Sequence, residues 1–452
     1  MAANKADIVN GSLTRTIFTF SIPLIVGTMI QVLFNMADQV VLGQMAGTNA
    51  VASVGACGTV TMLIVNFFCG LAGGVTILLA RAIGAGDDEM SGRILSTAVI
   101  SAFGVGLLGM TIALPLAGPL LHLTECPADC FDGAALYLRI YYSAVPAIVI
   151  YNFGSAVLRV SGDSQRPMYY LVFAGALNVV LNVILCLVLT EKVAAVAIAT
   201  MVSQALGAVL VMRRLFKMEE SWHLRLNTLH FDGELFRKML RYGIPNAFNS
   251  SLFCIANLQT QAAINSFGTE ALAGYSAACN LGGFPSAFSN SFAVTTMTMV
   301  GQNLGAQKRE RVNRSFKLTL LYSALLSELC GLGIFLFRYA LLGLYVPGSP
   351  AAVEYGIIYL IHVTLLHGIC AAHQTFSSYL NAFGYTTMTL ITSIICTIVF
   401  RTIWIQLFFP LVRSFGFVMA TFTIAWLLCF FINGAASIMV HKRYQRGIIR
   451  KL

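Results

Sequence analysis

Charged residues are scarce in this sequence, and their scarcity decides its class. Asp, Glu, Lys and Arg make up 10% of the 452 residues, whereas 58% are hydrophobic. Soluble globular domains carry roughly a quarter charged residues, so a soluble fold is excluded. A membrane-crossing helix needs about 20 mostly apolar residues, and twelve such helices with their connections would use the whole chain. The composition therefore predicts an all-α polytopic membrane protein with twelve transmembrane helices.

Motifs for nucleotide binding and hydrolysis are also missing. No lysine precedes Ser or Thr and no histidine precedes Glu, so the chain has neither a G-x-x-x-x-G-K-[ST] phosphate loop nor an H-E-x-x-H metal site. It also lacks the G-x-S-x-G elbow of hydrolases. We therefore expect neither an enzyme nor an ATP-driven pump, and no cofactor. An ion-coupled carrier, a passive pore and a flippase remain as alternatives.

The basic residues gather on one side of the predicted membrane. The formal net charge is +10, and 23 of the 28 Lys and Arg fall in cytoplasmic segments if both termini are cytoplasmic. This distribution follows the positive-inside rule, so the surplus reports topology, with weak attraction to anionic lipid and no nucleic-acid partner. The first helix lacks a signal-peptide cleavage site. The predicted spans cover residues 15–40, 50–80, 94–119, 134–158, 168–190, 193–214, 237–261, 271–301, 317–340, 354–380, 387–411 and 416–439.

Only two of the eighteen acids, Asp38 and Glu328, lie well within predicted spans. An acid in hydrocarbon is costly, and where it is kept it usually faces a bundle interior and serves ion or proton traffic. Gln31, Asn35 and Asp38 recur at i, i+4 and i+7 and form one polar stripe on a helix. Alternatively, Asp38 merely ends the first helix near an interface. Whether Glu328 faces the interior or pairs with Arg401 stays open.

The two halves of the chain repeat one another. Identical residues recur at an offset of 222, and each half holds six predicted spans. Because six is even, both copies enter the membrane in the same sense, which predicts two six-helix lobes related by a pseudo-two-fold axis along the membrane normal. The N-terminal lobe, with the cation site, would cover residues 1–220 and the C-terminal lobe 221–452. The matching pairs include Arg15 and Arg237, Pro23 and Pro245, Asn35 and Asn257, Tyr137 and Tyr359, and Gly162 and Gly384.

The repeat also shows where the halves differ. Asp38 aligns with Thr260, so the acid belongs to the N-terminal half only. Pro23 and Pro245 lie inside the first helix of each half, and each removes one intrahelical hydrogen bond. Pro23, close to Asp38 in sequence, is a candidate hinge. Prolines are also common in transmembrane helices that do not bend during function.

Oxygen-bearing side chains accompany Asp38 in the N-terminal half. Asn178 and Asn182 are spaced one helical turn apart, and Thr200 lies on the next span. Carboxylate, amide and hydroxyl oxygens are the ligands that a hard cation prefers, so these residues, with Asn152 nearby, are candidates for a Na⁺ or H⁺ coupling site. Each amide could instead form an ordinary hydrogen bond between helices.

Polar residues are also regularly spaced in the C-terminal half. Asn257 and Gln261 are four residues apart, and His367 and Gln374 are seven apart on the tenth span. They either line a substrate cavity or serve as hydrogen-bonded packing residues. The candidates for a substrate cavity are Gln31, Asn35, Asn257, Gln261, His367 and Gln374.

Most of the eleven cysteines lie in apolar segments, as small buried hydrophobic residues do. Cys126 and Cys130 are the exception, because they lie close together in a predicted loop. Their spacing alone cannot establish a disulfide, so they are either bonded or free.

Motifs along nearly the whole chain resemble those of the multidrug and toxic compound extrusion (MATE) transporters, in the multidrug/oligosaccharidyl-lipid/polysaccharide exporter superfamily. Each motif is short, but their order on a duplicated chain of twelve spans is specific. The motifs are S-I-P at Ser21, N-x-x-D-x-x-x-x-G from Asn35, A-R-x-x-G-A-G from Ala80, L-R-x-x-G-D from Leu158, L-N-x-x-x-N from Leu177, A-T-x-x-S-Q from Ala199 and G-Q-N-L-G-A from Gly301.

The resemblance implies two lobes around a V-shaped cavity, and export of cationic or lipophilic drugs in exchange for H⁺ or Na⁺. It places the cation site on Asp38, Asn178, Asn182 and Thr200, with Asn152 nearby. It also matches Pro23 to the proline at which the first span bends, and we expect a monomer in the cell membrane. Some members carry further acids on spans seven or ten, which this chain lacks. A lipid or lipid-linked oligosaccharide flippase of the same superfamily is the alternative.

Overall fold

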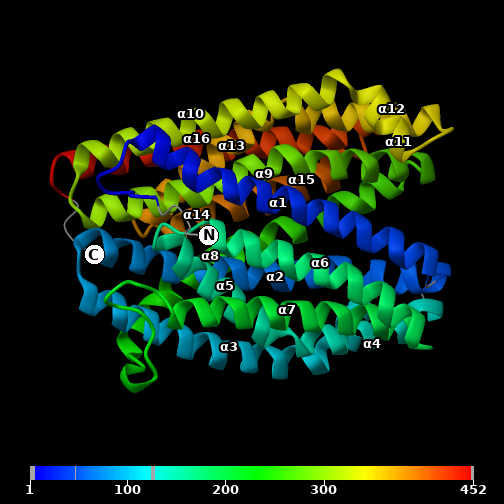
Figure 1. Ribbon diagram of the computed structural model, residues 1–452. Helices are drawn as coiled ribbons and strands as arrows, with labels where there is room; N and C mark the ends of the chain where they lie inside the picture. The colour runs from blue at the N-terminus through cyan, green and yellow to red at the C-terminus, as the bar shows by residue number, and fades with distance from the viewer. Residues whose placement is uncertain (1–5, 46, 124–127, 449–452) are drawn as a thin grey trace. The chain divides into compact units, whose positions relative to one another are not determined.

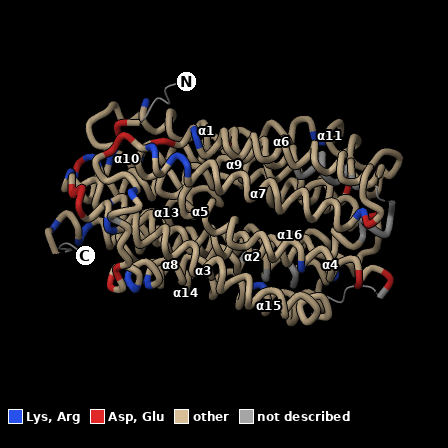
Figure 2. Tube along the Cα trace, turned by 60° about the horizontal axis from the view of Figure 1, so that its bottom comes forward, with Lys and Arg blue, Asp and Glu red and all other residues tan. Residues whose placement is uncertain are grey.

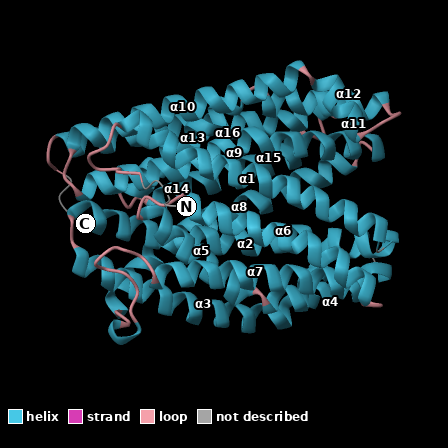
Figure 3. Ribbon diagram, viewed as in Figure 1, coloured by secondary structure: helices cyan, strands magenta, loops and turns pink. Residues whose placement is uncertain are grey.

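Helices account for all the regular structure in the part of the chain that the computed structural model describes, residues 6–45, 47–123 and 128–448. Figure 3 shows helices joined by loops, with no strand in these ranges. Charged residues lie mainly near helix ends, and the middles of the long helices carry almost none (Figure 2). Helices satisfy their backbone hydrogen bonds internally, as a bilayer requires. The predicted all-α polytopic membrane fold is therefore confirmed.

The described chain divides into two compact units, which we call unit 1 and unit 2. Unit 1 contains Ile22–Ala247, and unit 2 contains Asp7–Ser21 together with the described residues from Phe248 onward. The chain therefore changes unit inside its first helix, and again inside the helix that opens the second half of the sequence.

Unit 1 is built from long apolar helices around one core. This core draws on buried side chains such as Leu79, Leu95, Leu138 and Val157. Loops connect the helices, and the long connection over residues 217–232 contains a single 3₁₀ turn (Figure 1). The elements are α1 (Leu13–Met45, from Ile22 on), α2 (Gly47–Ala85), α3 (Asp88–Leu123), α4 (Ala128–Ser143), α5 (Val145–Val160), α6 (Gln165–Val188), α7 (Lys192–Phe216), η1 (Leu226–Thr228) and the start of α8 (Gly233–Asn265).

The fourth predicted span, 134–158, is not one continuous helix. The chain forms α4 and α5 with a bend of 47° between them at Ala144. Pro146 occupies the first turn of α5, where its missing N–H costs nothing but would interrupt a helix that ran through it. The predicted fourth span corresponds to this bent pair, and its break at Ala144 was not predicted.

Unit 2 contains more interruptions than unit 1. Its helices pack around buried residues such as Leu281, Leu360, Phe422 and Trp426. The elements after α8 are α9 (Thr269–Gly305), α10 (Arg309–Leu336), α11 (Arg338–Tyr345), α12 (Pro350–Tyr359), η2 (Leu360–Thr364), α13 (His367–Ala382), α14 (Thr386–Ser393), η3 (Ile394–Val399), α15 (Phe400–Ile403), η4 (Trp404–Phe408) and α16 (Phe415–Gln445).

Two of the predicted spans contain π-helical turns. Span ten is α12, the π-helical η2 and α13, and span eleven is α14 and α15 with the π-helical η3 and η4. At η2 the Leu365 N–H bonds to the Leu360 carbonyl, five residues back, and the helix is then interrupted before His367. Wide turns of this kind are frequent at functional sites.

Among the described residues, nine helices are long and apolar enough to cross a membrane, or ten when the bent pair α4 and α5 counts as one span. Helices α8 and α9 supply the remaining two of the twelve predicted spans. The described helices therefore make this a multi-pass membrane protein, and they are consistent with the twelve predicted spans.

Candidate functional site

Three polar side chains of unit 1 meet between α6 and α7. The Asn178 amide donates to the Thr200 hydroxyl oxygen at 3.3 Å, and the Asn178 carbonyl oxygen accepts from the Asn182 amide at 3.2 Å. Asn178 and Asn182 are 8% and 1% exposed. The structure thus brings together three of the five residues predicted to hold the coupling cation, and we call them the amide cluster.

Each member of the amide cluster is oriented by the helix that carries it. Asn178 and Asn182 are one turn apart on α6 and so share one face. On α7, the Thr200 hydroxyl donates to the Val196 carbonyl at 3.0 Å, which leaves its oxygen to accept from Asn178. The cluster is neutral and contains amide and hydroxyl oxygens, the ligand types that suit a hard cation.

Helix α1 packs closely against α6 in the same unit. A Cβ added at Gly27 would lie 3.2 Å from Met168, and one added at Gly175 would lie 2.4 Å from Phe34. In both contacts the α6 residue follows its α1 partner by the same number of positions in the sequence, so the two helices run in the same direction. That offset puts Asp38 level with the residue after Asn178. The side chains of Asn35 and Asp38 themselves lie outside the described part of the structure.

Two other predicted residues of unit 1 lie apart from the amide cluster. The Asn152 amide donates to the Ile148 carbonyl at 2.9 Å, within its own helix α5. Gln31 lies on α1 with an exposed side chain. The described contacts therefore do not join Asn152 or Gln31 to Asn178 and its partners.

The first turns of α1 and the segment just before them belong to unit 2 and are bound there by polar contacts. Ser21 and Thr295 share a hydrogen bond of 2.8 Å between their hydroxyls, and the Lys308 ammonium donates to the Asn10 side chain at 2.7 Å. Pro23 lies two residues beyond Ser21, where the chain has just entered unit 1. The predicted hinge therefore coincides with the point at which α1 changes unit.

The residues of unit 2 that were predicted to line a substrate cavity each form a separate contact. Gln261 donates to Asn265 at 3.0 Å on the same helix, and Gln374 donates to the Cys370 sulfur at 3.5 Å. His367 shares a 3.4 Å hydrogen bond with Ser286, and its ring packs edge-on against Trp426. Asn257 accepts from the Arg401 guanidinium at 3.3 Å.

The sequence left open only whether Arg401 pairs with Glu328, yet within the described residues of unit 2 it is the most deeply enclosed charged side chain. It is 0% exposed, and its guanidinium carbon lies 4.2 Å from the centre of the Phe422 ring. The signal was present in the sequence, because Arg401 is the one Lys or Arg well inside a predicted span. The pattern could not show which groups surround it.

Glu328 bonds to the backbone of a neighbouring helix. Its carboxylate accepts from the Gly368 N–H at 2.8 Å, at the start of α13. A Cβ at Gly368 would lie 3.0 Å from the same carboxylate, so glycine permits the close approach. Among the described ion pairs, Glu328 and Arg401 do not form one, so the suggested pairing of the two is absent.

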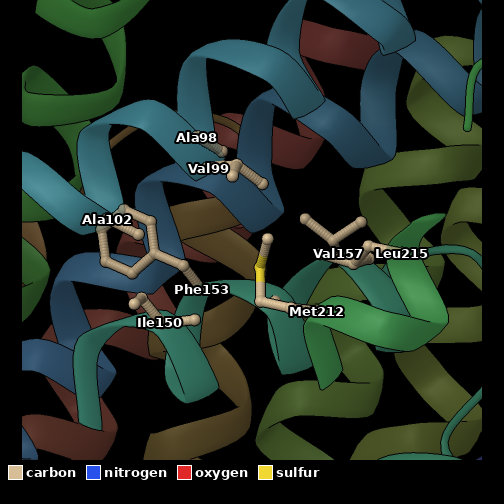
Figure 4. Close-up of a pocket in the computed structure, with 9 residues that line it drawn as sticks. Ala98, Val99, Ala102, Ile150, Phe153, Val157, Met212 and Leu215 are labelled. Carbon is tan, nitrogen blue, oxygen red and sulfur yellow. The ribbon is translucent and has the colours of Figure 1, made fainter. Parts of the chain in front are cut away.

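A small cavity in unit 1 lies among α3, α5 and α7 (Figure 4). Its lining is apolar throughout, so it offers no group to recognise an ion or a polar ligand. The labelled residues are Ala98, Val99, Ala102, Ile150, Phe153, Val157, Met212 and Leu215.

The described side chains offer no ready cluster of His, Cys, Asp and Glu ligands for a metal ion. Within the described residues, no three His, Cys, Asp or Glu side chains gather as a metal cluster would require. A Na⁺ site at the amide cluster would use oxygen ligands instead, together with Asp38.

Cys126 lies outside the described residues, and with it the suggested pairing to Cys130.

Comparisons with known proteins cover most of the chain. The MatE family model matches residues 23–184 and 245–405, one match in each half. A Bacillus subtilis relative named "Probable multidrug resistance protein YpnP" is 25% identical over 420 residues, 89% of this chain and 90% of its own. A Shewanella oneidensis relative named "FAD transporter" is 23% identical over 84% of each chain. A solved structure of a MOP superfamily transporter from Pyrococcus furiosus has a TM-score of 0.88 at 22% identity, over 98% of this chain and 99% of its own.

Proposed function

Because the chain belongs to the MATE family of multidrug and toxic compound extrusion transporters, we propose that it exports cationic or lipophilic drugs or metabolites in exchange for H⁺ or Na⁺. Drug or metabolite efflux follows from the family. The coupling to an ion, the chemistry of the substrate and the absence of any cofactor are parts of the proposal. So are its place in the cell membrane with both termini cytoplasmic, its action as a monomer and its lack of enzymatic activity.

The amide cluster carries the proposal for ion coupling. Its amide and hydroxyl oxygens lie between α6 and α7, with both asparagines buried, and the spacing of the α1 and α6 contacts supports a position for Asp38 at the same level. A carboxylate beside neutral oxygens can bind either a proton or Na⁺ inside the membrane. The proposed cation site consists of Asp38, Asn178, Asn182 and Thr200. Asn152 is a further candidate ligand outside this group.

The coupling step follows from how α1 is held. A cation can drive a conformational change only by binding two states unequally. Residues before Ser21 are bound within unit 2, whereas Ile22 onward belongs to unit 1. Pro23 removes one backbone hydrogen bond just beyond this change of unit, so a bend there costs less than elsewhere in the helix. We propose that cation binding near Asp38 bends α1 at Pro23 and weakens drug binding.

A second function is a lipid or lipid-linked oligosaccharide flippase of the same superfamily. One relative of similar sequence identity is named an FAD transporter, and FAD is a large anionic molecule. A flippase would move a lipid between leaflets and would not export a drug such as ethidium. The two functions therefore differ in the substrate that is moved.

Ethidium efflux tests the proposal most directly. Vesicles containing wild type, Asp38→Asn or Asp132→Asn would be given Na⁺ and H⁺ gradients varied independently; Asp132 is an exposed acid on α4 and serves as the control. We expect wild type and Asp132→Asn to follow one gradient, and Asp38→Asn to lose concentrative export at equal protein amount. Concentrative export by Asp38→Asn would exclude the proposed coupling role. No ethidium efflux under either gradient would favour the flippase.

A further inference from the structure

Arg401 lies inside unit 2 on an unusual stretch of helix. It belongs to the four-residue α15, between the π-helical segments η3 and η4. Its side chain is 0% exposed. Arginine stays protonated in proteins, so this residue puts a fixed positive charge within an apolar span. Charged residues inside a membrane are costly and are usually kept for a functional reason.

The guanidinium contacts groups that attract cations. Its Nη1 donates to the Asn257 carbonyl oxygen at 3.3 Å, and its central carbon lies 4.2 Å from the centre of the Phe422 ring. An aromatic ring face attracts a cation at this distance, and the attraction grows when water is excluded. Asn257 comes from α8 and Phe422 from α16, so two helices hold the charge from different sides.

Two tyrosines extend the aromatic surface around this charge. Tyr275 of α9 and Tyr359 of α12 pack edge to face with ring centres 5.5 Å apart, and Tyr359 packs edge to face on Phe422 at 6.3 Å. Through these contacts both tyrosines are joined to the Phe422 ring, over which the Arg401 guanidinium lies. An amide oxygen with several aromatic rings is the arrangement that proteins use to bind organic cations such as quaternary ammonium groups.

We propose that unit 2 contains a cation-binding site and that the chain fills this site with the guanidinium of its own Arg401. The site is formed by Asn257 and Phe422, with Tyr359 packed on Phe422 and Tyr275 packed on Tyr359. With Arg401 truncated, the site takes a small planar organic cation of the guanidinium class from solution. Since Arg401 cannot dissociate, unit 2 holds no exchangeable cation at this place. Only this last consequence, for transport, rests on the proposed antiport function.

Chemical complementation tests the site without any transport measurement. Arg401→Ala would be purified in detergent, and its thermal unfolding followed with increasing methylguanidinium or with N-methylurea, a neutral molecule of the same planar shape. We expect Tm of Arg401→Ala to rise saturably by several degrees with methylguanidinium and not with N-methylurea, because a ligand that binds only the folded state stabilises it. The wild type has the site filled, so its Tm should not rise.

Two further variants sharpen the result. Arg413→Ala removes an exposed arginine from the loop after span eleven, and methylguanidinium should leave its Tm unchanged. Phe422→Leu combined with Arg401→Ala removes the aromatic face and should reduce the rise seen with Arg401→Ala alone. A rise that survives this change undiminished would overturn the assignment of Phe422 to the site.

Three results would overturn the proposal. One is folded Arg401→Ala protein whose Tm does not respond to methylguanidinium, and another is an equal response to N-methylurea, which would indicate only a vacated cavity. If Arg401→Ala does not accumulate, cells would be grown with each compound, and accumulation restored by methylguanidinium alone supports the site. Accumulation restored by neither is the third contrary result. Failure of ethidium export would leave all three readouts unaffected, so the two proposals can fail separately.

Discussion

Asn178 holds the amide cluster of unit 1 together, because it donates to Thr200 and accepts from Asn182. A buried amide left without partners costs roughly 1–3 kcal/mol, so these three side chains are kept together by their shared hydrogen bonds. In the proposed cation site, bonds to the ion would have to replace some of these hydrogen bonds.

The surroundings of Asp232 predict that the stability of unit 1 depends on pH. Its carboxylate accepts from the backbone N–H of Leu235 and of Glu234 at the start of α8, and it pairs with Arg93 of α3. The hydrogen bond from Leu235, followed by that from Arg93, lowers the pKa of Asp232 below its usual range. Such a group stabilises the folded state above its unfolded pKa of about 3.9 and loses this effect as pH falls through the folded pKa.

We therefore expect Asp232→Asn to lower Tm at neutral pH, and the difference from wild type to shrink as the pH falls below the usual Asp range. Thermal unfolding in detergent across a pH series measures this. Glu234→Gln is the matched control, because exposed Glu234 pairs only with exposed Lys238 and should contribute little. A difference that stays constant into acid would show that the substitution disturbs packing rather than charge.

The residue scale also shows what a sequence pattern can and cannot predict. The four-residue spacing of Asn178 and Asn182 correctly placed both on one face of a helix. Their partner Thr200 depends on the rotation of α7 against α6, which periodicity does not determine. The surroundings of Arg401 involve α8 and α16, far apart in sequence, so its role could not be derived from spacing.

At the scale of helices, the contact of α1 with α6 positions the proposed cation site. A Cβ on Gly175 would lie 2.4 Å from the Phe34 ring, so a larger residue must push α1 away from α6. We expect Gly175→Val to cost about 1–3 kcal/mol of stability through overpacking and to reduce ion-driven ethidium efflux. Efflux rates at matched protein amounts measure the second effect.

A second substitution identifies the cause. Phe34→Ala in the Gly175→Val chain removes the opposing ring and should restore a large part of the lost efflux, since contacting residues do not act additively. Gly104→Val on α3 is the control, because a Cβ there meets no atom within 4 Å. Equal losses from Gly104→Val and Gly175→Val would contradict a specific role for the α1 and α6 contact.

Some interruptions of the helices are visible in the sequence, and others are not. Pro146 marks the start of α5, and a stricter use of its missing N–H would have predicted the bend at Ala144. No proline lies within η2, η3 or η4, although Pro410 follows η4 by two residues. At η2 the Thr364 carbonyl lies where a Cβ on Gly331 of α10 would collide, so contact between helices accompanies this wide turn. Such packing is invisible to a local pattern.

At the scale of the molecule, duplication made the family and the twelve spans predictable, since the MatE match also falls into two similar stretches. The repeat correctly paired Pro23 with Pro245, and both lie within three residues of a point where the chain changes unit. The change of unit itself depends on packing across the whole chain and has no local signal. The charges differ between the halves as well, with Asp38 in α1 of one and Arg401 in span eleven of the other.

This difference in charge predicts the exchange ratio. If Asp38 carries the exchangeable cation and Arg401 permanently fills the site of unit 2, one cation should enter for each substrate exported. In proteoliposomes clamped at zero membrane potential, net substrate flux should then stop when the substrate gradient equals the opposing cation gradient. A carrier that exchanges two cations for each substrate would hold a substrate gradient equal to the square of the cation gradient. Such a result would contradict the assignment. Because Arg401 is part of the chain, the ratio should stay the same whether the coupling ion is H⁺ or Na⁺.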